Sequence, residues 1–422
     1  MVQVAPADAA DIQLLKDEEA SMGLMMEEGI ATISFYKGEF KPAAEALRAQ
    51  FALVVASNAW LAGHLVKTKA GVHLRHPVSP SATEIDSLFT ATSAEDTAAF
   101  KLTPTSPYTK ICTDMYKSKV VIVGSGNSIL GKNQPVALLT LSESAPSEFA
   151  LIFSISHVVA DGRTYYEILK MLQPGAVVRE LSSSRVMSFS EAMRDKCGRK
   201  ELEWADSIST VCMYSCSMLP AMLGYGKKAR CFAFHLDPER LAATKTAAAL
   251  GGQVPYVTTN DILTSGFFNE CGARIGMMGM DCRGRLEGIG HDLAGNYVTA
   301  LTMDPETFAT PASVRKMLSS TPYETTGLPL PGCCGWACGM ESANFAMATN
   351  WSSFAGGMVE LAGCEMVVHL PVQNPVIPFD LIIPFASGKG RVGVICWTVS
   401  TDEKGLRAAL PVGECVSRDL FP

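Results

Sequence analysis

This chain of 422 residues has little charge and lacks a basic excess. Charged residues make up 18% and hydrophobic residues 48%, a balance typical of chains that bury a large core. It has 35 Lys and Arg residues and 42 Asp and Glu residues, which gives a formal net charge of −7 at pH 7. Because nucleic-acid binding needs a basic surface, we exclude nucleic acid as a partner. The length predicts two or three structural units.

The thirteen cysteines lack the spacing of a metal site, since the sequence contains no C-x-x-C pair. The tightest group, Cys333, Cys334 and Cys338, lies in a glycine-rich stretch with no histidine nearby. We therefore expect buried free thiols and no metal. Free thiols persist in a reducing compartment, so we expect a cytoplasmic protein.

Targeting and membrane signals are also weak. The acidic stretch Met1–Ser21 has neither an apolar run nor an arginine, so it resembles neither a secretory signal nor a transit peptide. Residues 207–226 are uncharged over a length that could span a bilayer. Several Ser and Thr residues and Pro220 interrupt them. We expect a buried or groove-lining helix there, with a peripheral membrane contact as the alternative.

Hydrophobic periodicity predicts helices and strands mixed in both halves of the chain, an α/β fold with mixed sheets. The strand over 149–156 is apolar on both faces, so we expect it at the centre of a sheet. Thr259, Asn260 or Asp261 would cap one helix. The predicted helices are 42–66, 163–172, 238–249 and 259–271; the predicted strands are 120–123, 135–141, 149–156, 231–236, a glycine-rich region 276–302, 379–385 and 392–399.

One glycine-rich segment imitates a phosphate-binding loop. Gly126-Asn-Ser-Ile-Leu-Gly131-Lys132 has the right spacing, but Asn133 stands where Mg²⁺ binding needs Ser or Thr. A strand is predicted next, so the helix N-terminus that favours phosphate is missing. We expect a hairpin turn and no nucleotide site.

The strongest signal is His157-Val-Val-Ala-Asp161-Gly162, between a buried strand and an amphipathic helix. Residues at such a strand end can meet a substrate. A neutral imidazole can take a proton from an acceptor hydroxyl at physiological pH. Asp161 could orient the imidazole or pair with an arginine, and Gly162 allows an unusual backbone angle and leaves room beside the ring. The competing interpretation is a solvated His–Asp turn.

The segment FSISHVVADGRTYYEIL resembles the active-site signature of the BAHD acyltransferases. These belong to a superfamily that includes chloramphenicol acetyltransferase and the condensation domains of peptide synthetases. Further segments resemble the family in the same order, so the resemblance covers about residues 40–400. They are ALRAQFALVVASNAWLAGHLV, RCFAFHLDPERLAATK, VTTNDILTSGFF, MDCRGRLEGIGHDLAGNYV and ATNWSSF.

The resemblance implies two similar α/β domains, here residues 1–190 and 231–422, joined by a connection over 191–230. Acyl-CoA and the acceptor would enter a channel between them from opposite faces. Acyl-CoA would be a co-substrate, with no bound cofactor, and the acceptor a small molecule with a hydroxyl or amine. Because both halves of the channel lie in one chain, a monomer is implied.

The resemblance also implies residue roles. His157 would be the general base, and Asp161 would be structural, paired with Arg283. Trp351, beside Asn350, matches a residue whose N–H can support the tetrahedral intermediate. The basic residues Lys227, Lys228 and Arg230 could neutralise CoA phosphates, although a solvated linker is the favoured interpretation. The remaining histidines are assigned to structural or surface roles: His64, His73, His76, His235, His291 and His369.

Two departures separate this chain from parts of the superfamily. Val359-Glu-Leu-Ala-Gly363 replaces the D-F-G-W-G motif of plant members, which puts the channel wall in question but not the base. Ser156 precedes His157 where condensation domains and wax-ester synthases usually carry a second histidine. Two alternatives stay open: an acyltransferase acting on diacylglycerol or a fatty alcohol, and a catalytically silent member that binds a partner.

Overall fold

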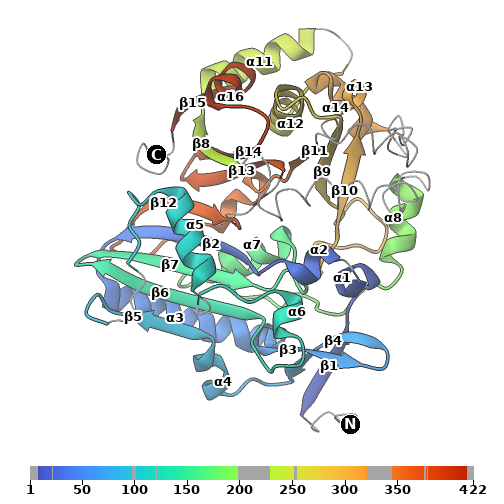
Figure 1. Ribbon diagram of the computed structural model, residues 1–422. Coiled ribbons are helices and arrows are strands. Elements are labelled where there is room, and N and C mark those ends of the chain that lie inside the picture. Colours follow the sequence, from blue (N-terminus) through green and yellow to red (C-terminus); the bar gives the residue numbers. More distant parts are fainter. Residues whose placement is uncertain are drawn as a thin grey trace.

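Two lobes make up this protein in a computed structural model (Figure 1). The structure describes residues 8–20, 22–96, 101–118, 121–197, 229–250, 254–320, 323, 345–374, 377 and 379–415. The first lobe holds a five-stranded sheet of order β12-β2-β7-β6-β5 and a three-stranded sheet of order β1-β4-β3. The second holds a seven-stranded sheet of order β10-β9-β11-β13-β14-β8-β15. The two larger sheets contain parallel and antiparallel pairs, which confirms the predicted mixed α/β class.

The elements of the first half begin and end as follows: β1 Ala9–Gln13, α1 Lys16–Ala20, α2 Met22–Met26, β2 Ile30–Lys37, α3 Phe40–Ser57, the 3₁₀ helix η1 Ala59–Ala62, β3 His64–Thr68, β4 Gly71–Pro77, α4 Ala82–Ser87, β5 Phe89–Thr92, α5 Tyr108–Lys117, α6 Gly126–Ile129, β6 Ala137–Ala145, β7 Glu148–Ile155, α7 Gly162–Met171 and α8 Phe189–Cys197. Those of the second half are β8 Arg230–Leu236, α11 Pro238–Leu250, α12 Thr259–Glu270, β9 Ile275–Asp281, β10 Val298–Met303, α13 Pro305–Phe308, α14 Pro311–Ser319, β11 Phe345–Ala348, the 3₁₀ helix η2 Ser352–Gly357, β12 Glu365–Val372, β13 Asp380–Gly388, β14 Arg391–Thr398, α16 Glu403–Ala409 and β15 Val412–Cys415.

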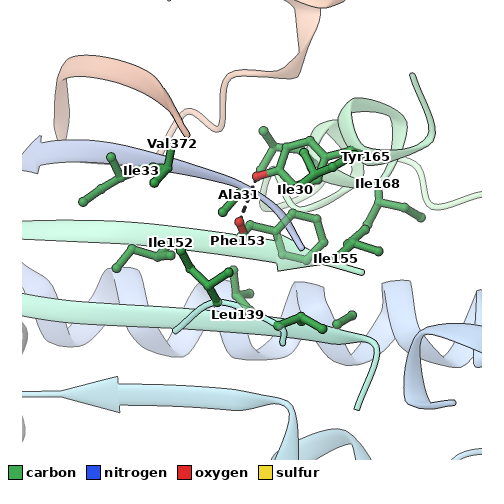
Figure 2. Close-up of a cluster of buried hydrophobic side chains, with 14 of the residues drawn as sticks. Ile30, Ala31, Ile33, Leu139, Ile152, Phe153, Ile155, Tyr165, Ile168 and Val372 are labelled. Atoms are coloured by element: carbon green, nitrogen blue, oxygen red, sulfur yellow. Dashed lines mark hydrogen bonds between the residues drawn. The ribbon is translucent and has the colours of Figure 1, made fainter. Parts of the chain in front are cut away.

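Strand β7 lies at the centre of the five-stranded sheet, between β2 and β6, as its apolar faces predicted. Phe149 and Phe153 point to one face of the sheet, because they are four residues apart on the strand. Phe149 contacts Phe40 of α3 at 5.9 Å between ring centroids, and Phe153 contacts Tyr165 of α7 at 5.2 Å. Both helices therefore cover the same face, and Figure 2 shows the packing around Phe153 and Tyr165. This core packing holds the end of β7 at Ile155, two residues before His157.

The predicted helix over 42–66 is wrong in its second half. Helix α3 ends at Ser57, and the chain turns through η1 into β3. The Asn58 amide donates to the carbonyl oxygens of Val54 and Arg179 at 3.2 and 3.0 Å, which closes the helix end. A Cβ at Gly63 would lie 2.7 Å from Leu74, so the chain passes too close to β4 for a continuing helix.

Two predictions upstream of His157 are also wrong. Residues 121–123 form a turn and loop rather than a strand, and the Val123 amide donates to Ser154 Oγ at 3.1 Å. Gly126–Ile129 is the one-turn helix α6, not a hairpin turn. A Cβ at Gly126 would lie 2.5 Å from Val158, so this glycine permits close packing against the loop that carries His157.

In the second lobe, the predicted helices 238–249 and 259–271 correspond to α11 and α12. The N-cap of α12 is Thr258, so the predicted caps Thr259, Asn260 and Asp261 are wrong; Asp261 completes a capping box with Thr258. Asp261 is needed at that position because it is buried and pairs with Arg315 at 2.7 Å. The glycine-rich region 276–302 splits into β9 and β10, joined by the connection 282–297.

Sheet membership does not follow the linear order of the chain. Strand β12, from the second half, pairs antiparallel with β2 and completes the first sheet. The boundaries 1–190, 191–230 and 231–422 stay a prediction, and they did not anticipate this crossing. Within the described residues, no helix is long and apolar enough to cross a membrane. Residues 207–226, Lys227 and the cysteines at 333, 334 and 338 lie outside the described residues.

Candidate active site

His157 stands in the short loop between β7 and α7, with its two ring nitrogens in different surroundings. Nδ1 is buried and has no hydrogen-bond partner among the described residues. Nε2 is not among the buried atoms without a partner, and it lies 4.0 Å from Oε2 of Glu27, whose side chain is 63% exposed; the His157 side chain is 24% exposed. Nε2 is therefore the nitrogen that an acceptor can reach.

Asp161 is turned away from His157 and into the protein. Its Oδ1 caps α7 by accepting from the Thr164 amide at 2.8 Å. Its Oδ2 accepts from Arg283 at 2.8 Å and from the Tyr297 amide at 3.0 Å. The side chains of Asp161 and Arg283 are 1% and 0% exposed, so the pair is fully buried. Within the described residues, the hydrogen bonds of this carboxylate go to α7, Arg283 and Tyr297 and not to the imidazole, and the structural role that the resemblance implies stays a prediction.

Arg283 joins the two lobes through almost all of its donors. Nε donates to Leu293 O at 2.9 Å, and Nη2 donates to Gly295 O at 2.9 Å and to Thr164 Oγ1 at 3.0 Å. Burial by itself lowers the pKa of Arg283, but the adjacent Asp161 carboxylate outweighs burial and the pKa is raised. The guanidinium remains charged, so the connection 282–297 is held against the start of α7.

A second buried pair, absent from the sequence predictions, holds the other end of the loop. Glu18 of α1 is fully buried and accepts from Arg185 Nε at 2.9 Å and from the Asn296 amide at 2.9 Å. The Asn296 side chain donates to His157 O at 2.8 Å, and Arg185 donates to Val159 O at 3.0 Å. The backbone of the His157 loop is therefore fixed by three segments distant in sequence.

Gly162 lies next to Trp351, but it does not have the unusual backbone angle that was predicted. Its backbone is not in the left-handed region, so the expected unusual angle is wrong. A Cβ there would lie 3.5 Å from Phe354 and 3.8 Å from Trp351 Nε1, which are ordinary contact distances. The first turn of α7 thus lies against the Trp351 indole, which in turn packs edge-on against Tyr166 at 6.0 Å.

The predicted oxyanion donors are engaged within their own loop. Trp351 Nε1 donates to Thr349 Oγ1 at 3.2 Å. Asn350 Oδ1 accepts from the Ser352 amide at 2.8 Å and from its hydroxyl at 2.7 Å. To support a tetrahedral intermediate, the Trp351 N–H would have to exchange Thr349 for the substrate oxygen.

Arg230 lies on β8, donates to Thr401 O at 2.5 Å and stacks over Phe232. Its predicted contact with CoA phosphates stays a prediction.

Among the other histidines, His369 is buried, with Nδ1 2.8 Å from Ser34 Oγ and Nε2 3.1 Å from the Tyr166 hydroxyl. Burial lowers the pKa of His369 to about 4. Within the described ranges, no group of three His, Cys, Asp or Glu residues could hold a metal ion.

A cavity of about 670 Å³ lies elsewhere, between β3, β4 and α4. His64, Arg75 and Glu84 contribute to its lining, whereas His157, Asp161 and Trp351 do not. We locate the candidate site by the geometry of the His157 loop, because Nε2 and the two buried pairs meet there.

Two mixed α/β lobes meet at this loop, where Asp161 of one is paired with Arg283 of the other. No protein-family model matches the chain, and no curated protein matches it in sequence. Solved structures do match. The first condensation domain of the CDA synthetase has a TM-score of 0.60 at 12% identity, over 94% of this chain and 93% of that one.

Two further structures cover almost the whole chain. The starter condensation domain of rhizomide synthetase RzmA, in complex with C8-CoA, has a TM-score of 0.58 at 10% identity, over 97% of both chains. F. graminearum TRI101, complexed with Ethyl Coenzyme A, has a TM-score of 0.55 at 12% identity, over 97% of this chain and 100% of that one. At such low identity the likeness establishes the fold, which confirms the fold that the resemblance implied.

Proposed function

We propose that this protein is an acyltransferase that moves an acyl group from a CoA thioester to a hydroxyl or amine of a small acceptor. One observation carries the proposal. Nε2 of His157 lies 4.0 Å from the exposed Glu27 carboxylate, while Asp161 is buried and paired with Arg283. The neighbouring structures support the donor class, since TRI101 was also solved with Coenzyme A and T-2 mycotoxin.

The proposed reaction needs one base. Nε2 of His157 removes the proton from the acceptor hydroxyl or amine as that atom bonds to the thioester carbonyl carbon. The carbonyl oxygen becomes an oxyanion, for which a correctly placed donor supplies ~3–4 kcal/mol. We assign this role to Trp351. The C–S bond then breaks, and the CoA thiolate leaves with the proton from the His157 imidazolium.

The first experiment measures thermal stabilisation by a panel of CoA thioesters, from acetyl and malonyl to aromatic and long-chain, with free CoA as control. A ligand at ~100 times its dissociation constant adds ~2.7 kcal/mol to the free energy of unfolding. The expected rise in melting temperature is about 3 °C for a chain of 422 residues. A shift selective for one acyl class identifies the donor.

The second experiment tests the base. His157→Ala should bind the selected thioester as tightly as the wild type but consume none of it with any acceptor. His291→Ala removes an exposed histidine and serves as the matched control, with wild-type turnover. Absence of stabilisation by every CoA species, or turnover by His157→Ala at the wild-type rate, would contradict the proposal.

A further inference from the structure

The fully buried carboxylates around the His157 loop each have a cation. Asp161 is paired with Arg283, which also contacts Asp281, and Glu18 is paired with Arg185. One charge beside the base is left unmatched: the Glu27 carboxylate, 4.0 Å from His157 Nε2 and 63% exposed. In the part of the chain that the structure describes, no lysine or arginine is paired with Glu27. When His157 is neutral, the net charge next to its Nε2 is therefore the negative charge of the Glu27 carboxylate.

This carboxylate lies where the acceptor must come. An atom that gives its proton to Nε2 has to approach within about 3 Å of it, so that atom lies within about 7 Å of the Glu27 carboxylate from any direction. Glu28 follows in sequence, and both carboxylates add to burial and Cys112 in raising the pKa of the Tyr116 phenol. The acceptor's side of the base is thus negative.

We propose that Glu27 selects acceptors that carry a positive charge next to the attacking group, such as amino alcohols and diamines. This inference rests on the proposed function and narrows its acceptor class. A cation offsets the carboxylate that would otherwise oppose the developing oxyanion. Two opposite unit charges about 7 Å apart, at an effective dielectric constant between about 20 and 80, give roughly a 3- to 50-fold gain in binding.

Glu27 could instead stabilise the His157 imidazolium, and the two roles differ in a measurable way. Stabilising the imidazolium would accelerate transfer to neutral and cationic acceptors alike. Selecting a cation changes the affinity for cationic acceptors only. The test therefore compares small alcohols that differ chiefly in charge and have no amine that diethyl pyrocarbonate can modify. They are choline (cationic), 3,3-dimethyl-1-butanol (neutral, with the same shape) and 3-hydroxypropanoate (anionic).

The readout does not depend on acyl transfer. Diethyl pyrocarbonate modifies accessible imidazoles, and mass spectrometry follows the modification of the peptide that contains His157. The concentration of each probe that halves the rate is measured for the wild type, Glu27→Gln and Glu45→Gln. Glu45 is an exposed carboxylate on α3 and is the matched control. Glu27 is exposed, so Glu27→Gln is expected to fold, which its melting temperature checks.

In the wild type and in Glu45→Gln, choline should protect His157 at about 3- to 50-fold lower concentration than 3,3-dimethyl-1-butanol. The advantage should vanish in Glu27→Gln, where 3-hydroxypropanoate protects better than in the wild type. Equal protection by the cationic and neutral probes, or no protection by any probe, overturns the inference. Thioester consumption by the wild type is assayed separately, so failure of the proposed function is recognised by itself.

Discussion

Replacing Arg283 with methionine should destabilise the protein strongly, because it leaves the Asp161 carboxylate buried without its cation. Removal of one partner from a buried ion pair costs about 3–5 kcal/mol. Asp161 is 1% exposed and retains only its bonds from the Thr164 and Tyr297 amides. Leu293 O also loses its donor, and Gly295 O and Asp281 each lose one of several donors. We therefore expect a cost near the upper end of that range.

The matched variants separate charge from geometry. Arg283→Lys keeps the positive charge but cannot reproduce the guanidinium's branched donors, so an intermediate cost is expected. Asp161→Asn combined with Arg283→Met removes both buried charges, and the double variant should be more stable than the sum of the single losses predicts. The expected coupling is about 2–3 kcal/mol. Urea unfolding of the four variants and the wild type measures each free energy.

Two results would refute this reasoning. If Arg283→Met costs less than about 1 kcal/mol, the pair does not hold the loop against the second lobe. If the single losses add without coupling, the two residues act independently, and the geometry that turns Asp161 away from His157 has another cause.

The remaining predictions concern neighbours of the loop and the core. Gly162→Ala should leave the free energy of unfolding within about 0.5 kcal/mol of the wild type, because the new Cβ makes only ordinary contacts. Gly126→Ala should cost about 1–3 kcal/mol, because its Cβ would press against Val158. Chemical unfolding of the two variants measures both values. Asn296→Ala should lower kcat at unchanged thioester affinity, because His157 O loses its donor. Burial lowers the pKa of His369 to about 4, so the stability it contributes is present above about pH 6.5 and is lost as pH falls towards 4. His369→Gln should lose roughly 3 kcal/mol less than the wild type over that window, measured by urea unfolding at each pH.

The position of His157 could be predicted because its signals are local. An apolar run on both faces of 149–156 gives a central strand, and the periodicity of 163–172 gives the helix after it. A histidine between two such elements has to lie at the edge of a sheet. The same kind of signal failed at 42–66, where alanines and valines continue past Ser57. The helix ends there because the Asn58 side chain bonds to Arg179 and Leu181, more than a hundred residues away.

Two buried ion pairs, Asp161–Arg283 and Glu18–Arg185, hold the His157 loop. Their partners are distant in sequence, and this explains why only the first pair was predicted. Arg283 was matched to Asp161 by resemblance alone, since nothing local pairs residues 122 positions apart. Glu18 had no comparable guide: an acidic residue near the N-terminus reads as a solvated charge, yet it is fully buried 278 positions from its partner Asn296. A carboxylate can be buried only where a cation and several N–H groups converge on it. That convergence is a property of the assembled lobes, so a sequence that shows the base cannot show what holds its backbone in place.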